Sequence, residues 1–165
     1  MAIPGEVHWF SRLAQPLSPD EAAAAAAYAR LLGLGPECDV VEDWHEVERI
    51  ARDPRSGQGW WSREEAERVR LTREAAGRIG EELLLETLTT AVEGHAESTY
   101  ARAVEAGGDE ALARVASGAA LMAIHNRALA LLSGSGAEHV FVQKYALFAS
   151  GRWPLGTRGT TFTLF

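Results

Sequence analysis

His125, Asn126 and Arg127 form a polar triplet inside an otherwise apolar, helix-like stretch of the chain. Residues 119–124 before the triplet and 128–132 after it are apolar, and a helix that is apolar all round is normally buried. Burying an imidazole, an amide and a guanidinium is costly unless each group finds a partner. The sequence therefore predicts either that the fold supplies those partners or that the triplet lines a binding cleft, with His95 as a further candidate.

Two histidines and two glutamates could instead hold a metal ion. His95 and His125 lie on apolar helical stretches, and the stretch that carries His95 also contains Glu86 and Glu93. Facing helices that bring imidazoles and carboxylates together can bind a transition metal such as zinc or iron. Neither histidine belongs to a Glu-x-x-His or His-Glu-x-x-His motif. We therefore favour the interpretation that both histidines lie in the core and that no cofactor is bound. The alternative is a metal-binding helical-bundle enzyme in which Arg127 binds an anionic substrate.

Other residues with reactive side chains lack a catalytic setting. The chain has no Gly-x-Ser-x-Gly motif, and Cys38 stands beside Glu37 and Asp39, which would not lower the pKa of a thiol. Lys144 is the one lysine in the sequence, and we expect its stem to pack against apolar neighbours while its ammonium reaches water. The sequence identifies no catalytic residue and favours a protein that is not an enzyme.

Three of the five tryptophans stand in expected loops near arginine. They are Trp60, Trp61 and Trp153, the last of which follows Arg152 directly. Exposed tryptophan beside arginine is typical of an interface that binds another protein. The same residues could also close the ends of a helical bundle, because tryptophan is often partly buried. The sequence leaves both interpretations open.

The positions of capping residues and glycines predict about five helices. Ser18 and Glu21 form a capping box, Asp109 caps a later helix, and a long central helix is expected from Ser62 to as far as Ala106. Glycines at three positions in this long segment mark points where it could bend. The expected helices cover about 19–32, 40–52, 62–106, 110–133 and 137–150, and the three glycines are Gly77, Gly80 and Gly94.

The two ends of the chain look strand-like. Residues 6–10 and 160–165 are rich in β-branched and aromatic side chains, and pairing them would bury both segments and tie the termini together. We therefore expect one domain, residues 1–165, that is mainly α and carries a short two-stranded β element formed by the terminal segments. Asn126 and Arg127 could bind carbonyl groups of the tail at 151–156, which would give the triplet a purely structural role.

Composition and charge narrow the class of protein. With 165 residues, 47% of them hydrophobic, the chain can build a core. The net charge of −7 argues against binding to nucleic acid or to a membrane surface. A single cysteine excludes an internal disulfide, and no signal sequence or transmembrane helix is recognised. A cytoplasmic protein is expected.

The charges are distributed unevenly along the chain. Residues 81–105 contain six glutamates and one arginine, whereas residues 127–165 contain three arginines, one lysine and one glutamate. These segments could pair within the molecule or meet a partner. The tail Gly151–Gly156 is similar to the endings of some small bacterial immunity-type proteins, and this resemblance implies a protein-binding role. We therefore expect a protein-interaction domain whose partner is another protein or a second copy of itself.

Overall fold

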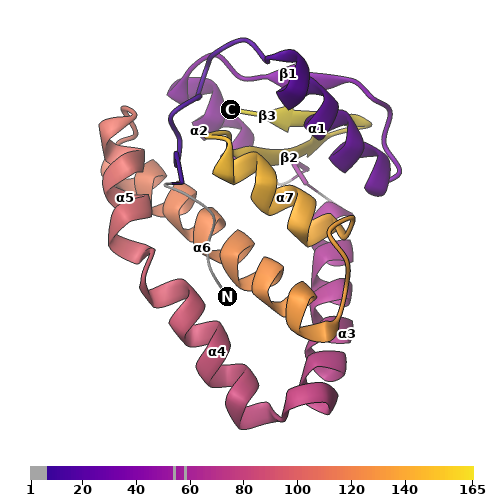
Figure 1. Ribbon diagram of the computed structural model, residues 1–165. Coiled ribbons are helices and arrows are strands. Elements are labelled where there is room, and N and C mark those ends of the chain that lie inside the picture. The colour runs from indigo at the N-terminus through magenta and orange to yellow at the C-terminus, as the bar shows by residue number, and fades with distance from the viewer. Residues whose placement is uncertain (1–6, 54, 58) are drawn as a thin grey trace.

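A computed structural model describes residues 7–53, 55–57 and 59–165, in which seven helices and a small sheet are present (Figure 1). The protein is mainly α with a short β element, as the sequence predicts. The helices are α1 (Pro19–Leu31), α2 (Trp44–Arg52), α3 (Trp60–Ile79), α4 (Glu81–Glu93), α5 (Ala96–Glu105), α6 (Glu110–Ser133) and α7 (Val140–Ala149). The strands are β1 (Cys38–Val40), β2 (Pro154–Arg158) and β3 (Thr161–Leu164).

Helix α6 is the central element of the fold. It begins where predicted, because the Asp109 side chain accepts a hydrogen bond from the Leu112 amide at 2.8 Å, and it packs against α3, α4, α5 and α7. Within the described part of the chain, α6 is the one helix that is long and apolar enough to cross a membrane, with a mean hydropathy of 1.3. Half of that apolar window is buried inside the fold, as in the core helix of a globular protein.

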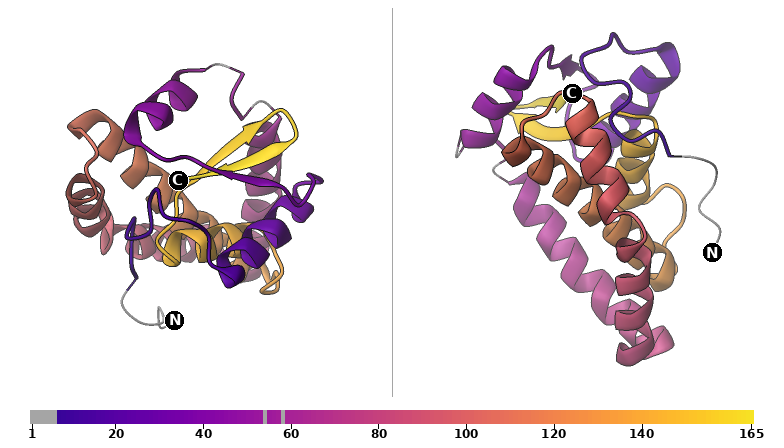
Figure 2. Two further views of the ribbon diagram at one scale, coloured as in Figure 1. Left: turned by 90° about the horizontal axis from the view of Figure 1, so that it is seen from above. Right: turned by 90° about the vertical axis from the view of Figure 1, so that its left-hand side faces the viewer.

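The predicted single helix from Ser62 to Ala106 is wrong, because this segment forms three helices. Gly80 has φ +86° and ψ 151°, a conformation that is open almost only to glycine, and it ends α3. Gly94 and His95 separate α4 from α5. Gly77 lies inside α3 and causes no break. Figure 2 shows α3 and α4 extending away from the end of the molecule that carries the sheet.

The sheet differs from the predicted pairing of the two termini. Strand β3 lies in the centre, with β1 parallel on one side and β2 antiparallel on the other. Residues 7–10 form no strand, since Trp9 and Phe10 turn into the core and Phe10 adopts φ +58°; residue 6 lies outside the described residues. The strand expected near 160–165 is present, but its edge partners come from the loop after α1 and from the tail.

The second helix also starts later than the sequence predicts. Val40 belongs to β1, and α2 begins at Trp44, where Asp43 accepts a hydrogen bond from the Glu46 amide at 2.8 Å. Val40 pairs with Leu164 in the sheet, which keeps it out of the helix. Residues of α2 and of the N-terminal end of α3 line one pocket.

Candidate functional site

The triplet on α6 does not face one cleft. Asn126 is fully buried, and its Oδ1 accepts a hydrogen bond from Arg68 Nε on α3 at 3.1 Å. Arg127, the next residue, packs against α7 instead, with its guanidinium 4.6 Å from the centre of the Tyr145 ring. The expected ties from Asn126 and Arg127 to the tail are wrong, because the two side chains hold α6 to α3 and to α7.

His125 and Asn126 leave two features that the sequence alone does not show. Burial, together with the nearby Arg68 charge, lowers the pKa of half-buried His125, and a contact of 3.3 Å between its Nδ1 and Asn126 Oδ1 opposes that shift. The Asn126 amide nitrogen is buried without a hydrogen-bond partner among the described residues. An unpaired buried polar group costs about 1–3 kcal/mol.

The alternative metal site is not assembled. His95 stands before α5, and its ring packs edge-on against Trp9 with 6.1 Å between ring centres. Glu86 and Glu93 are exposed on α4, whereas His125 lies beside Asn126. Among the residues that the structure describes, no three His, Cys, Asp or Glu side chains come together as a metal site. The prediction that His95, His125, Glu86 and Glu93 form one site is therefore wrong.

Lys144 is buried, which contradicts the expectation that its ammonium reaches water. Its Nζ donates to both carboxylate oxygens of Glu64, at 2.7 and 2.9 Å. The ammonium also lies 4.2 Å from the ring centre of Trp60 and 5.6 Å from that of Trp61. Burial lowers the pKa of Lys144, and the charge of Glu64 opposes this shift. Tyr28 extends the group by accepting a hydrogen bond from Trp60 Nε1 at 3.1 Å.

The four loop residues proposed as an interface separate into buried and exposed members. Trp60 and Trp153 are 3% exposed and Arg152 is fully buried, so the interpretation of these three residues as an exposed interface is wrong. Trp153 and Trp60 pack in two hydrophobic clusters of the core. Trp61 differs, because 53% of its surface is exposed. Trp60 is therefore buried, whereas the indole of the next residue, Trp61, faces outward.

A pocket of about 180 Å³ lies beneath Trp61. Its walls come from α2, α3, α6, α7, the loop before α3 and the tail around β2, and they are predominantly apolar. The lining residues are Ile50, Ala51, Ser56, Trp60, Trp61, Val115, Ala119, Met122, Lys144, Trp153, Pro154 and Leu155. Sequence reasoning missed this pocket because its walls come from segments far apart in the chain; the Trp60–Trp61 pair is the one signal that pointed to it.

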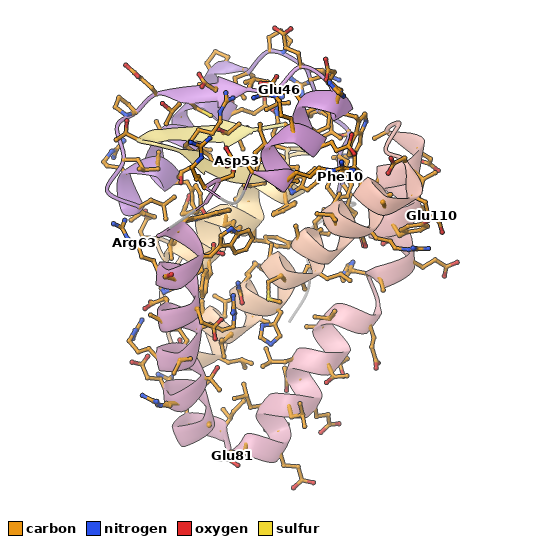
Figure 3. The ribbon with its side chains drawn as sticks, turned by 180° about the vertical axis from the view of Figure 1, so that it is seen from behind. Phe10, Glu46, Asp53, Arg63, Glu81 and Glu110 are labelled. Atoms are coloured by element: carbon orange, nitrogen blue, oxygen red, sulfur yellow. The ribbon has the colours of Figure 1, made fainter. Side chains whose placement is uncertain are left out.

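Exposed apolar side chains of α6 border this pocket. Val115 is 51% exposed and Met122 is 42% exposed, and their separation of seven residues places them on one face of the helix. Figure 3 shows α6 running between α3 and the α4–α5 segment. We call Trp61, Val115 and Met122, together with the pocket, the Trp61 surface.

The surroundings of Cys38 disfavour the thiolate form of its side chain. Burial and the neighbouring Asp39 raise the pKa of its thiol to about 11, so it is protonated near neutral pH. This agrees with the sequence-based interpretation of its surroundings.

Comparisons of this chain with protein-family models, with curated proteins and with solved structures find no match.

Proposed function

We propose that this protein is a protein-interaction domain whose partner places an apolar side chain in the pocket beneath Trp61. One observation carries the proposal: three large exposed apolar side chains from two helices surround an apolar pocket. Tryptophan and methionine are enriched at protein interfaces. The residues that dominate binding energy are found at well-packed pockets in the centre of an interface. The partner is another protein or a second copy of this chain, and we place the interaction in the cytoplasm.

The size of the pocket favours a single side chain over a cofactor. Ligand sites in proteins have volumes of about 300–1,000 Å³, whereas this pocket has about 180 Å³. An apolar cavity of about 150 Å³ holds one benzene molecule. The pocket therefore accommodates one aromatic or branched aliphatic side chain. A metal-dependent enzyme has less support, since the residues proposed as ligands lie apart.

The proposal can be tested by a photo-reactive residue at two positions. Benzoylphenylalanine in place of Met122, in cells that naturally express the protein, is expected to give one discrete cross-linked product. The same residue in place of Ala22, which is exposed on α1, should not give that product. A product of twice the mass of the chain would identify a second copy as the partner.

The identified partner then allows a quantitative test. Removal of the indole in Trp61→Ala should weaken binding by about 30-fold, because residues at the centre of an interface contribute about 2 kcal/mol or more. Val69→Ala serves as the control, since Val69 is also exposed on α3 but does not line the pocket. No product at Met122, or equal affinity of the Trp61→Ala and Val69→Ala variants, would contradict the proposal.

A further inference from the structure

Lys144, the one lysine of the chain, lines the pocket beneath Trp61. Its Nζ lies 4.2 Å from the ring centre of Trp60 and 5.6 Å from that of Trp61, and both of these residues line the pocket as well. Helix α7 therefore holds a buried primary amine beside two aromatic rings at the wall of an apolar cavity.

Glu64 provides this amine with a proton acceptor. Both of its carboxylate oxygens accept hydrogen bonds from Lys144 Nζ, at 2.7 and 2.9 Å, and the side chain of Glu64 is itself buried. An ammonium group has three N–H donors and no lone pair, so it can attack a carbonyl carbon only after it loses a proton. Glu64 lies close enough to take that proton directly.

The surroundings of Lys144 favour the neutral amine more than water does. Burial lowers the pKa of Lys144, the carboxylate of Glu64 opposes this shift, and the charge of Arg68 adds to it. A lysine side chain in water has a pKa of about 10.4 and is almost entirely protonated at neutral pH. A lysine desolvated in an apolar pocket is an activated nucleophile toward carbonyl groups.

The pocket limits which carbonyl compounds can reach this amine. Its volume is about 180 Å³, and a cavity of about 150 Å³ holds one benzene molecule. One ring with one carbonyl group therefore fits, whereas two rings do not. The lining residues that the structure describes include no aspartate, glutamate or arginine, and the charge of Lys144 is already balanced by Glu64. The pocket therefore favours uncharged compounds.

We propose that Lys144 forms an imine with small, uncharged aromatic or branched aliphatic aldehydes that enter the pocket beneath Trp61. Glu64 takes one proton from the ammonium, and the lone pair of Nζ forms a bond to the carbonyl carbon while the π electrons of the C=O bond move to oxygen. A proton then passes from nitrogen to that oxygen and gives a carbinolamine. Glu64 returns its proton to the hydroxyl group, the C–O bond breaks and water leaves. The iminium nitrogen retains the positive charge opposite the carboxylate of Glu64.

Reductive trapping tests the inference on the whole protein. Benzaldehyde and sodium cyanoborohydride convert an imine into a stable benzylamine, which peptide mass spectrometry locates; a benzyl group on a lysine side chain identifies Lys144, since the chain has no other lysine. At neutral pH, Lys144 should be labelled at least tenfold faster than acetyl-lysine amide in the same tube, because the free amine is almost entirely protonated. This difference should disappear in urea that unfolds the protein.

Three comparisons show whether the reaction takes place in the pocket. Biphenyl-4-carboxaldehyde, which has two rings, should label acetyl-lysine amide but not Lys144. Ala119→Phe places a ring in the pocket and should slow labelling by benzaldehyde at least tenfold, whereas Ala22→Phe, at an exposed position on α1, is the matched control and should be labelled like the wild type. Excess toluene, which fills the pocket without reacting, should slow labelling of the wild-type protein and needs no substitution.

The contrary outcomes are equally specific. Labelling of Lys144 no faster than that of acetyl-lysine amide would overturn the inference. Labelling of Lys144 by both aldehydes alike, or a rate that toluene does not change, would show that the reaction does not use the pocket and would overturn it too. The inference goes beyond the proposed function and needs no protein partner, so loss of the Met122 cross-link would contradict the proposed function alone.

Discussion

Lys144 and Glu64 place two opposite charges inside the protein, next to the indole rings of Trp60 and Trp61. Only 5% of Lys144 and 3% of Glu64 is exposed, so both charges have lost most of their hydration. Two hydrogen bonds and the nearby rings compensate for this loss. A buried pair of this kind is weak evidence for stability, because an apolar pair of similar volume is often as stable. It does make the pair sensitive to the removal of one partner.

Removal of one charge should therefore destabilise the protein much more than removal of both. Lys144→Met leaves Glu64 buried without its cation and should lower the free energy of unfolding by about 3–5 kcal/mol. The double variant Lys144→Met with Glu64→Leu should recover most of this loss. Urea denaturation followed by circular dichroism measures both variants. Equal stability of the single and double variants would show that the charges are not coupled.

The helical elements depend on two glycines in different ways. Gly77 and Gly80 are three residues apart, yet Gly77 lies inside α3 and Gly80 joins α3 to α4. Of these two glycines, only Gly80 has a positive φ. Gly80 therefore provides the turn between α3 and α4, which both pack against α6.

Alanine at these two positions should have opposite effects. Gly77→Ala should raise the free energy of unfolding by up to about 1 kcal/mol, because alanine favours the helix and its Cβ meets open space. Gly80→Ala should lower it by about 1–3 kcal/mol, the cost of a non-glycine residue in such a conformation. Thermal melts of the two variants provide the comparison. Stabilisation by Gly80→Ala would indicate that α3 and α4 tolerate a continuous helix.

At the scale of the whole molecule, Arg152 connects the two ends of the chain. It is fully buried and binds Glu21 of α1 through Nε and Nη2, at 3.0 and 3.2 Å. It also donates to the carbonyl oxygens of Gln15 and Pro16, at 2.6 and 2.8 Å. One side chain thus joins the N-terminal segment, α1 and the tail that leads into the sheet.

Arg152→Lys should fail to replace this connection. A lysine ammonium cannot reproduce the planar set of donors that binds one carboxylate and two carbonyls, so we expect a loss of about 3–5 kcal/mol in the free energy of unfolding. Chemical denaturation provides the measurement, and Arg30→Lys, an exposed arginine on α1, is the control. Wild-type stability of Arg152→Lys would refute this role.

The same connection should respond to acid. Burial alone would raise the pKa of Glu21, but hydrogen bonds from Arg152 and Ser18 outweigh it and lower the pKa to about 2. Because the ordinary value of 4.5 is higher, the unfolded chain binds the proton first as the pH falls. The stabilisation is therefore complete above pH 4.5 and is lost as the pH falls toward 2. Glu21→Gln should remove this part of the acid dependence.

Local signals in the sequence determined the helical class of the protein and several helix ends. The capping box of Ser18 and Glu21 and the cap at Asp109 depend on contacts between residues three apart in the sequence. Such contacts can be predicted from the sequence alone. The β-branched and aromatic residues near the C-terminus likewise predicted a strand there. Gly77, Gly80 and Gly94 were recognisable as points where a helix could bend, but only the structure shows that Gly77 lies inside α3 while Gly80 and Gly94 stand at helix ends.

Only the tertiary structure determined which polar residues are buried, which partners they bind and where the candidate site lies. Lys144 and Glu64 are 80 positions apart in the sequence, and Arg152 and Glu21 are 131 positions apart. A local sequence pattern cannot predict contacts between residues so far apart. Trp60 and Trp61 are adjacent tryptophans, yet the packing of α3 buries the first and exposes the second. Burial and partner choice are properties of how elements pack, whereas helix formation is largely a property of neighbouring residues.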